Sequence, residues 1–278
     1  METGSLAIAN FRLGFASKEK LDFRHFVLKS AVTLKYWSKH MKRTHYMQRI
    51  FVGLALGAML ALPASLSVNR ALAADAAKGD LAPLPLQLPQ PTLKGTPDDL
   101  PSGPGIEPLS DKPRPPFMAP KGTKNVAFQK KVTLSDKNPI SGKPEMITDG
   151  QKEAFDDQVV EMHKNTQHAQ IDLGEPCTIY AVVIWHDHRW LQVFHDVIVQ
   201  VADDPDFTQN VRTLFNNDMD NSSGKGIGKD REYFETQEGK LIDTKGVKAR
   251  YLRSYTKGST LSAFNVHQEI EVYGIPAQ

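Results

Sequence analysis

Ile179-Tyr-Ala-Val-Val-Ile-Trp185 is the stretch that decides the fold class of this 278-residue chain. Its β-branched and aromatic residues are typical of a strand that is buried on both faces. Val197-Ile-Val-Gln-Val201 has the same character, whereas Tyr251-Leu-Arg-Ser-Tyr255 alternates more and can expose one face. Gly-, Asn- and Asp-rich breaks separate these runs, and no long amphipathic helical pattern accompanies them. The pattern predicts an all-β sandwich or barrel.

The first 73 residues differ in charge from the rest. They hold 11 Lys and Arg against 3 Asp and Glu, a net charge of +8; the whole chain carries +2, so residues 74–278 carry −6. The acidic remainder has no basic face of the kind that binds nucleic acid, so we expect no nucleic-acid partner.

Residues 41–73 have the organisation of an export signal. Basic residues precede a short apolar run, and Ala71-Leu-Ala73 supplies small residues before a cut at Ala74. We interpret residues 41–73 as a signal peptide and residues 1–40 as an over-long gene start. The protein is then periplasmic or extracellular, and it contacts a membrane only if the signal segment stays uncleaved.

Residues 74–122 hold 12 of the 18 prolines. Proline removes backbone donors and fixes φ, so neither helix nor sheet is expected here. We interpret this segment as a disordered Pro-rich linker, either an extended spacer or a tail without a role. The folded domain is then expected at 123–278. Its only cysteine is Cys177, so no disulfide can form within the chain.

Six short motifs follow one another after the Pro-rich segment. They are Asn125-Val-Ala, Ile147-Thr-Asp-Gly150, Ala169-Gln-Ile-Asp-Leu-Gly174, Asp196-Val-Ile-Val-Gln-Val-Ala-Asp-Asp-Pro-Asp-Phe207, Ala249-Arg-Tyr-Leu-Arg253 and Glu269-Ile-Glu-Val-Tyr-Gly274. In this order and spacing they resemble the discoidin family, which comprises the coagulation factor V/VIII type C domains and the family 32 carbohydrate-binding modules. The resemblance covers about half of the chain. It implies a galactose-binding-domain-like jelly-roll β-sandwich that binds ligands with its loops and has no catalytic machinery.

The resemblance also implies a structural calcium site. Its side-chain ligands would be Asp149, in the Asp-Gly turn, and Glu269, which opens the last strand. Backbone carbonyls would come from Met146, Gln151 and Gln268. Such hard oxygen ligands suit Ca²⁺, and an ion bound only by the folded state stabilises it. The family often places a hydroxyl ligand where this chain has Ala154, and the neighbouring Glu153 is a candidate substitute.

The segment His186-Asp-His-Arg-Trp190 follows the buried strand and is expected in a loop at one end of the sandwich. Sugar C–H faces stack on aromatic rings, and Arg, His and Asn side chains bond sugar hydroxyls. The resemblance implies this use for Arg189 and for an aromatic platform at Phe264, but the family His has no counterpart here. The candidate ligand-binding residues are His186, Arg189, Trp190, Phe264 and Asn265.

Three functions remain open. The first is an exported, non-catalytic module that recognises carbohydrate through the loops. The second is a protein-docking or envelope-scaffold domain without a free-sugar ligand. For either function, the 186–190 loop itself can alternatively be a charged, structurally packed loop in which Trp190 caps the core. The third is a metal-dependent enzyme, which needs His186, His188 and His195 to converge on one ion. The sequence lacks a His-x-x-x-His helix and a nucleophile elbow, which favours the non-catalytic functions.

Overall fold

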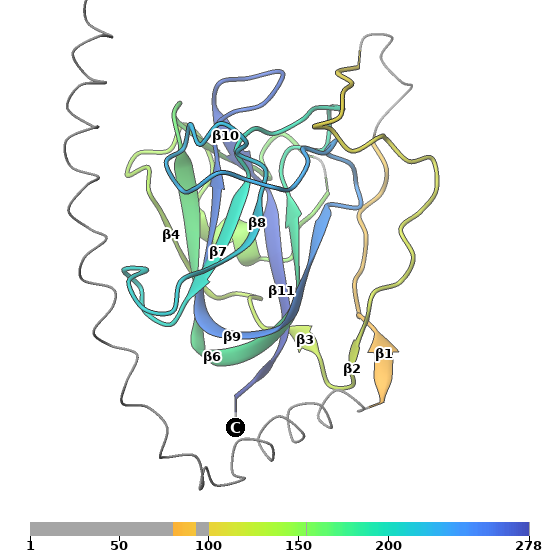
Figure 1. Ribbon diagram of the computed structural model, residues 1–278, viewed down its shortest axis with the longest axis vertical. Coiled ribbons are helices and arrows are strands. Elements are labelled where there is room, and N and C mark those ends of the chain that lie inside the picture. Colours follow the sequence, from red (N-terminus) through yellow and green to blue (C-terminus); the bar gives the residue numbers. More distant parts are fainter. Residues whose placement is uncertain (1–79, 93–99, 154, 278) are drawn as a thin grey trace, which may run out of the picture. The chain divides into compact units, whose positions relative to one another are not determined.

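The computed structural model describes residues 80–92, 100–153 and 155–277 (Figure 1). The expected gene-start segment and the expected signal peptide lie outside the described residues. Within the described ranges, no helix is long and apolar enough to cross a membrane. The elements are β1 (Leu81–Pro83), β2 (Met118–Pro120), β3 (Lys124–Asn125), β4 (Lys131–Leu134), the 3-10 helix η2 (Pro144–Thr148), β5 (Val160–Met162), β6 (Gln167–Trp185), β7 (Ile198–Ala202), β8 (Arg212–Asn216), β9 (Lys240–Thr256), β10 (Asn265–His267) and β11 (Glu269–Pro276).

Strands β6 and β9 organise the fold because they pair along almost their whole length and both bend in the middle. The first half of β6 pairs with β4 and with the second half of β9, from Gln167↔Thr256 to Asp172↔Tyr251. After a register shift, the second half of β6 pairs with the first half of β9 and with β11. The sheet order is β3-β11-β6-β9-β7-β8, with β4 added on β6. The described part of the chain is therefore all-β, as predicted, and its named strands pair antiparallel.

The run that begins at Ile179 is buried on both of its faces, as its composition predicts. Ile179, Val182 and Ile184 belong to the main core between the two halves of the bent sheet. Ala181, Val183 and Trp185 point to the opposite face, where they form a second apolar cluster with Tyr273. Trp185 is completely buried there and Tyr273 is only 2% exposed. Something outside the sandwich must therefore cover this outer face.

The Pro-rich segment supplies that cover. Leu84, Leu86 and Phe117 pack against the outer cluster around Trp185, and β1 pairs with β2 in an antiparallel ladder from Leu81↔Pro120 to Pro83↔Met118. We call residues 80–92 and 100–120 the strap; in Figure 1 it runs beside the sandwich. The expectation of a disordered linker without any strand is wrong for these residues. Proline is tolerated because the ladder is short and lies apart from the main sheet.

Polar contacts fix the strap to the sandwich at several points. Lys152 Nζ donates to the carbonyl of Gln87 at 2.7 Å. Arg114 donates from Nη1 to the carbonyl of Gly239 at 2.8 Å and from Nη2 to that of Glu238 at 2.7 Å. These bonds satisfy carbonyl groups that lack ladder partners, so the strap is an integral layer of the domain.

Candidate functional site

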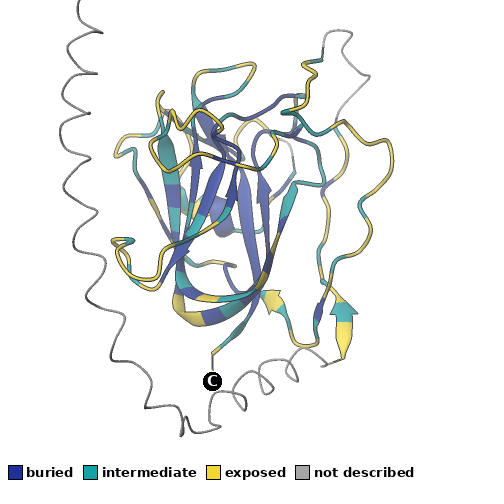
Figure 2. Ribbon diagram, viewed as in Figure 1, coloured by how far each residue is buried: buried dark blue, intermediate teal, exposed yellow. Residues whose placement is uncertain are grey.

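The bend in β6 and β9 brings most of the long loops to one end of the sandwich. Loops 163–166, 186–197, 217–236 and 257–264 all lie there, at the top of Figure 1. Figure 2 shows exposed residues concentrated in such loops, whereas the strands between them are buried. His195 joins two of the loops, because its N–H donates to Gly258 O at 2.9 Å and its carbonyl accepts from the N–H of Lys257 at 2.9 Å. This loop end is where the sequence-predicted ligand residues were expected.

Arg189 and Trp190 present the most open surface of the predicted set. Trp190 is 61% exposed. The Arg189 guanidinium is held by Asp187, with Nε and Nη2 each 2.7 Å from a carboxylate oxygen, and Nη1 also contacts Asp156. This double contact raises the pKa of Arg189, mainly through the hydrogen bond to Asp187. The pair is thus an exposed ring beside a fixed, charged group.

Buried bonds hold this loop in place behind the exposed tip. Gln192 Nε2 donates to the carbonyl of Asp187 at 2.8 Å, and Gln192 Oε1 accepts from the Ser259 hydroxyl at 2.7 Å. The ring of His188 is fully buried and its Nε2 lies 2.8 Å from the carbonyl of Lys152. The loop tip is therefore pre-organised, which lowers the entropy lost on binding a ligand.

His186 and Asn265 do not offer any surface to a ligand, because both are completely buried. His186 Nδ1 lies 2.5 Å from Glu235 Oε1. The expectation of direct ligand contact is wrong for these two residues. Glu235 is not predicted from the sequence. This residue lies 49 positions from His186, and no local sequence pattern predicts a contact over that separation.

The Asn265 amide is satisfied on both sides by its own loops. Its Oδ1 accepts from the hydroxyl of Thr256 and from the N–H of Gly258, both at 2.9 Å. Its Nδ2 donates to the carbonyls of His163 and Asn165 at 2.6 and 2.8 Å. All four hydrogen-bonding positions of the amide are in use. Asn265 therefore clamps two loops together and has no capacity left for a sugar hydroxyl.

Phe264 is half-buried, and its ring carries the ammonium group of Lys164 at 5.5 Å from the ring centre. One face of this ring is therefore engaged in a cation–π contact. Phe264 lies beside the clamp made by Asn265 and on a different loop from Trp190. Phe264 is therefore a weaker aromatic platform than Trp190. The sequence predicts Phe264 as the platform and Trp190 only as a further candidate ligand-binding residue.

The structure brings the Asp149-Gly150 turn close to Glu269, which are the two places from which the predicted calcium side-chain ligands come. The N–H of Gly150, in the Asp149-Gly150 turn, donates to Glu269 Oε2 at 3.2 Å across 119 residues. Asp149 Oδ1 accepts from the N–H of Gln151 at 2.8 Å. Gly150 has φ +88°, a conformation that favours glycine and that turns the chain toward Glu269. Met146 lies in η2 just before this turn, and Gln268 directly precedes Glu269.

Glu269 has the environment expected of a carboxylate that needs a cation. It is completely buried, and its Oε1 has no hydrogen-bond partner among the described residues. Burial raises the pKa of Glu269 to about 9, and the nearby charge of Glu271 adds to the effect. A bound cation would supply the missing compensation, so the residues present fit Ca²⁺.

The candidate substitute for the missing hydroxyl ligand is occupied elsewhere. Glu153 Oε2 accepts from the strap N–H of Gln90 at 3.3 Å, and the Glu153 carbonyl accepts from Gln268 Nε2 at 2.5 Å. Ala154 lies outside the described residues. Glu153 therefore links the strap and the start of β11 instead of pointing to a metal-ligand role.

The three histidines of the enzyme hypothesis do not converge. His186 and His188 are buried with different partners, Glu235 and the carbonyl of Lys152. His195 is partly exposed and lies 2.8 Å from Glu232 Oε1. In the part of the chain that the structure describes, the one group of three or more close metal-ligating side chains is Asp196, Asp218 and Asp220. A zinc centre built from these histidines is therefore contradicted.

Comparisons with solved structures give similar chains that are carbohydrate-binding modules. A chitosan-binding module from Paenibacillus sp. IK-5 has 18% identity and a TM-score of 0.39, covering 54% of this chain and 98% of its own. A fucose-binding module from Streptococcus pneumoniae has 17% identity and a TM-score of 0.39, covering 54% and 97%. A family 32 module from Clostridium perfringens, in complex with GlcNAc-α-1,4-galactose, has 18% identity and a TM-score of 0.39, covering 56% and 96%. No family model and no curated protein matches the sequence.

Proposed function

We propose that this protein is an exported, non-catalytic binding module that recognises carbohydrate at the loop end of its sandwich. The observation that supports this function is Trp190, an aromatic ring 61% exposed on a loop whose base is buried and hydrogen-bonded. Burying a large apolar side chain stabilises a fold by roughly 1.5–3 kcal/mol. A rigid loop that leaves its Trp in solvent forgoes this gain, and sugar rings stack on such a surface.

Arg189 supplies the polar half of the proposed site. Its contacts to Asp187 and Asp156 use three of the guanidinium N–H groups, which leaves two of the five donors for sugar hydroxyls. The carboxylates also fix the plane of the group next to Trp190. His186 and Asn265 act behind the site, where they hold its loops.

Replacing Trp190 by Ala is expected to weaken sugar binding at least tenfold, because the stacking surface is lost. Isothermal titration of the full chain against galactose-type and other neutral sugars measures this, and Arg189→Ala should weaken the same sugar. Leu81→Ala is the matched control, since Leu81 is 53% exposed on β1 and lies far from the loops. If the Trp190→Ala variant and the control bind the sugar with equal affinity, Trp190 is not part of the sugar-binding site.

One observation favours the second candidate, protein docking. Phe155 and Leu261 are each 61% exposed, like Trp190. Their loops meet that of Trp190, because Asp156 contacts Arg189 and the N–H of Thr260 donates to the carbonyl of Val193 at 2.9 Å. Clustered exposed apolar side chains are typical of protein interfaces. If this function holds, no sugar of the panel binds, and Leu261→Ser impairs binding to an extracellular or envelope protein.

We also propose that Asp149, Glu269 and the carbonyls of Met146, Gln151 and Gln268 hold a structural Ca²⁺. The buried, unpartnered Oε1 of Glu269 supports this site. The ion would join the Asp-Gly turn to the first residue of β11. The hydrogen bond between Gly150 and Glu269 already connects these two segments. It would neutralise a carboxylate that is otherwise costly to bury.

Adding Ca²⁺ to EDTA-treated protein is expected to raise the melting temperature, by the equivalent of about 2.7 kcal/mol at a hundredfold excess over Kd. Glu269→Gln should abolish this shift while the variant stays folded, because Gln removes only the charge. Glu175→Gln, at the exposed bend of β6, is the control that keeps the shift. Calcium-independent melting of the unmodified protein would exclude the site.

A further inference from the structure

A second concave surface lies at the loop end, apart from Arg189 and Trp190. It is an open groove of about 500 Å³ that is lined by the 195–196 and 217–222 regions, by Glu232 and by Lys257. The strap forms part of its wall through Gly105, whose carbonyl accepts from the N–H of Glu232 at 2.9 Å. Because the strap was expected to be a free linker, the sequence alone does not predict this groove.

The groove carries an excess of negative charge. The carboxylates of Asp196, Asp218 and Asp220 lie with their oxygens within 4.8 Å of one another. Lys257 provides partial compensation, with its Nζ 3.8 Å from Asp196 Oδ2. Burial, together with the charge of Asp196, raises the pKa of Asp218 even though two backbone N–H groups bond to it. The three carboxylates thus favour a further positive charge nearby.

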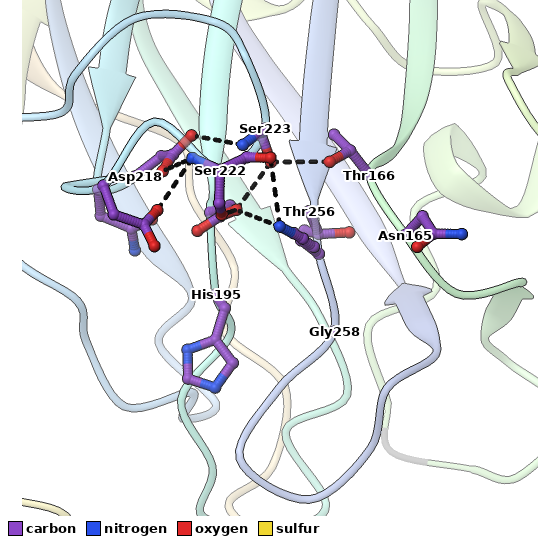
Figure 3. Close-up of polar contacts among 12 residues, drawn as sticks. Asn165, Thr166, His195, Asp218, Ser222, Ser223, Thr256 and Gly258 are labelled. Atoms are coloured by element: carbon purple, nitrogen blue, oxygen red, sulfur yellow. Dashed lines mark hydrogen bonds and ion pairs between the residues drawn. The ribbon is translucent and has the colours of Figure 1, made fainter. Parts of the chain in front are cut away.

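The acidic groups are held in a rigid frame. The N–H groups of Ser222 and Ser223 each donate to Asp218 at 2.9 Å. The hydroxyls of the same two serines donate to Asp196 Oδ2 at 2.6 and 2.8 Å. Figure 3 shows this network continuing from Ser223 to Thr166, with His195 to one side. The frame fixes the carboxylates but does not neutralise them.

An independent feature of the groove is Asn217. It is 3% exposed and lines the groove. Its Oδ1 accepts from the N–H of Val197 at 2.7 Å, which fixes Nδ2 as the free end of the amide. This nitrogen is buried and has no hydrogen-bond partner among the described residues. An unpaired buried donor is costly, so Nδ2 favours a ligand that offers an oxygen acceptor.

We propose that this groove binds an amino sugar, with its protonated amine near Asp196 and Asp220 and a hydroxyl oxygen accepting from Asn217 Nδ2. A bare divalent cation would bind the carboxylates, but it cannot accept a hydrogen bond from the amide of Asn217. A neutral sugar can accept this hydrogen bond, but it brings no positive charge to the carboxylates. A protonated amine beside hydroxyl groups suits both. The choice of a sugar as ligand rests on the proposed function, whereas the groove is separate from the Trp190 site.

Titration of the full chain with glucosamine and with N-acetylglucosamine, followed by NMR, tests this site. Glucosamine is expected to bind at least tenfold more tightly, because acetylation removes the charge, and its binding should weaken as salt is added. Asp220→Asn should weaken it at least fivefold. Asp220 is exposed and Asn keeps the oxygen that accepts from the N–H of Ser222, so the fold is retained. Lys257→Met should strengthen binding, since it removes the competing cation.

The controls separate this site from the Trp190 site and from other ligands. Glu175→Gln removes one charge at the bend of β6 and should leave glucosamine binding unchanged, as should Leu81→Ala on β1. Equal binding of the two sugars, or equal effects of Asp220→Asn and Glu175→Gln, would overturn the proposal. So would Ca²⁺ binding that displaces glucosamine and is lost in Asp220→Asn, because the cluster would then be a metal site. If the Trp190→Ala variant loses glucosamine binding, glucosamine binds at the Arg189–Trp190 site and not in the acidic groove.

Discussion

A chain that begins at residue 123 is expected to be much less stable than one that begins at residue 74. The shorter chain lacks Leu84, Leu86 and Phe117, which cover the outer cluster around Trp185. Each large apolar side chain exposed by the deletion costs about 1.5–3 kcal/mol, partly offset by the entropy that ordering the strap requires. We expect a net loss of roughly 3 kcal/mol or more on this basis. Urea unfolding of the two chains measures the difference.

Point variants separate the strap contacts from the effect of shortening the chain. Leu84→Ala with Leu86→Ala should destabilise the longer chain by roughly 2 kcal/mol, because both side chains are only partly buried. Leu88→Ala is the matched control, since Leu88 is 46% exposed, and it should change little. Identical unfolding midpoints for the two chain lengths would mean that the segment is a free linker after all.

Replacing Lys152 by Met is expected to cost about 3–5 kcal/mol of stability. Lys152 Nζ lies 2.7 Å from Glu271 Oε1, with both side chains at most 10% exposed. The same ammonium donates to the strap carbonyl of Gln87 at 2.7 Å and lies 4.9 Å from the centre of the Trp185 ring. Removing it leaves the Glu271 carboxylate buried with only the Tyr273 hydroxyl as a donor among the described residues. Thermal or urea unfolding gives the value.

A double variant and an exposed pair serve as controls for Lys152. Adding Glu271→Gln to Lys152→Met should recover part of the loss, because the unpaired charge disappears. Lys121→Met breaks the ion pair between Lys121 and the strap residue Asp80, and should cost under about 1 kcal/mol because the two side chains are 65% and 79% exposed. A similar small effect for Lys152→Met would show that its ammonium group is not essential to the fold.

The fold class could be predicted because it depends on local periodicity. The Ile179–Trp185 run alternates between two buried faces, and such a run can only be a strand inside a layered structure. The same run also predicted that other residues cover its outer face. Nothing in the sequence near the strap indicated that the strap supplies these residues. The prolines hid this role, because they argued against regular structure in a segment where Leu84 and Leu86 directly follow the short strand β1.

The site could be predicted only in outline. The sequence located the 186–190 loop at an end of the sandwich, and Trp190 is indeed its exposed tip. It could not tell that His186 and Asn265 turn inward, because their partners Glu235 and Thr256 are chosen by the packing of the loops. Residue type states what a side chain can bond, whereas burial decides whether a ligand can reach it.

The sequence by itself determined the strand runs at 179–185, 197–201 and 251–255, the Asp149-Gly150 turn and the polar loops, because these depend on neighbours a few residues apart. The tertiary structure alone decided which groups meet. Lys152 pairs with Glu271, and Gly150 with Glu269, each across 119 residues. Closing such distances requires the whole bent sheet and the strap to form together. For that reason the outer cover, the buried Glu269 and the acidic groove at Asp220 emerge only from the folded chain.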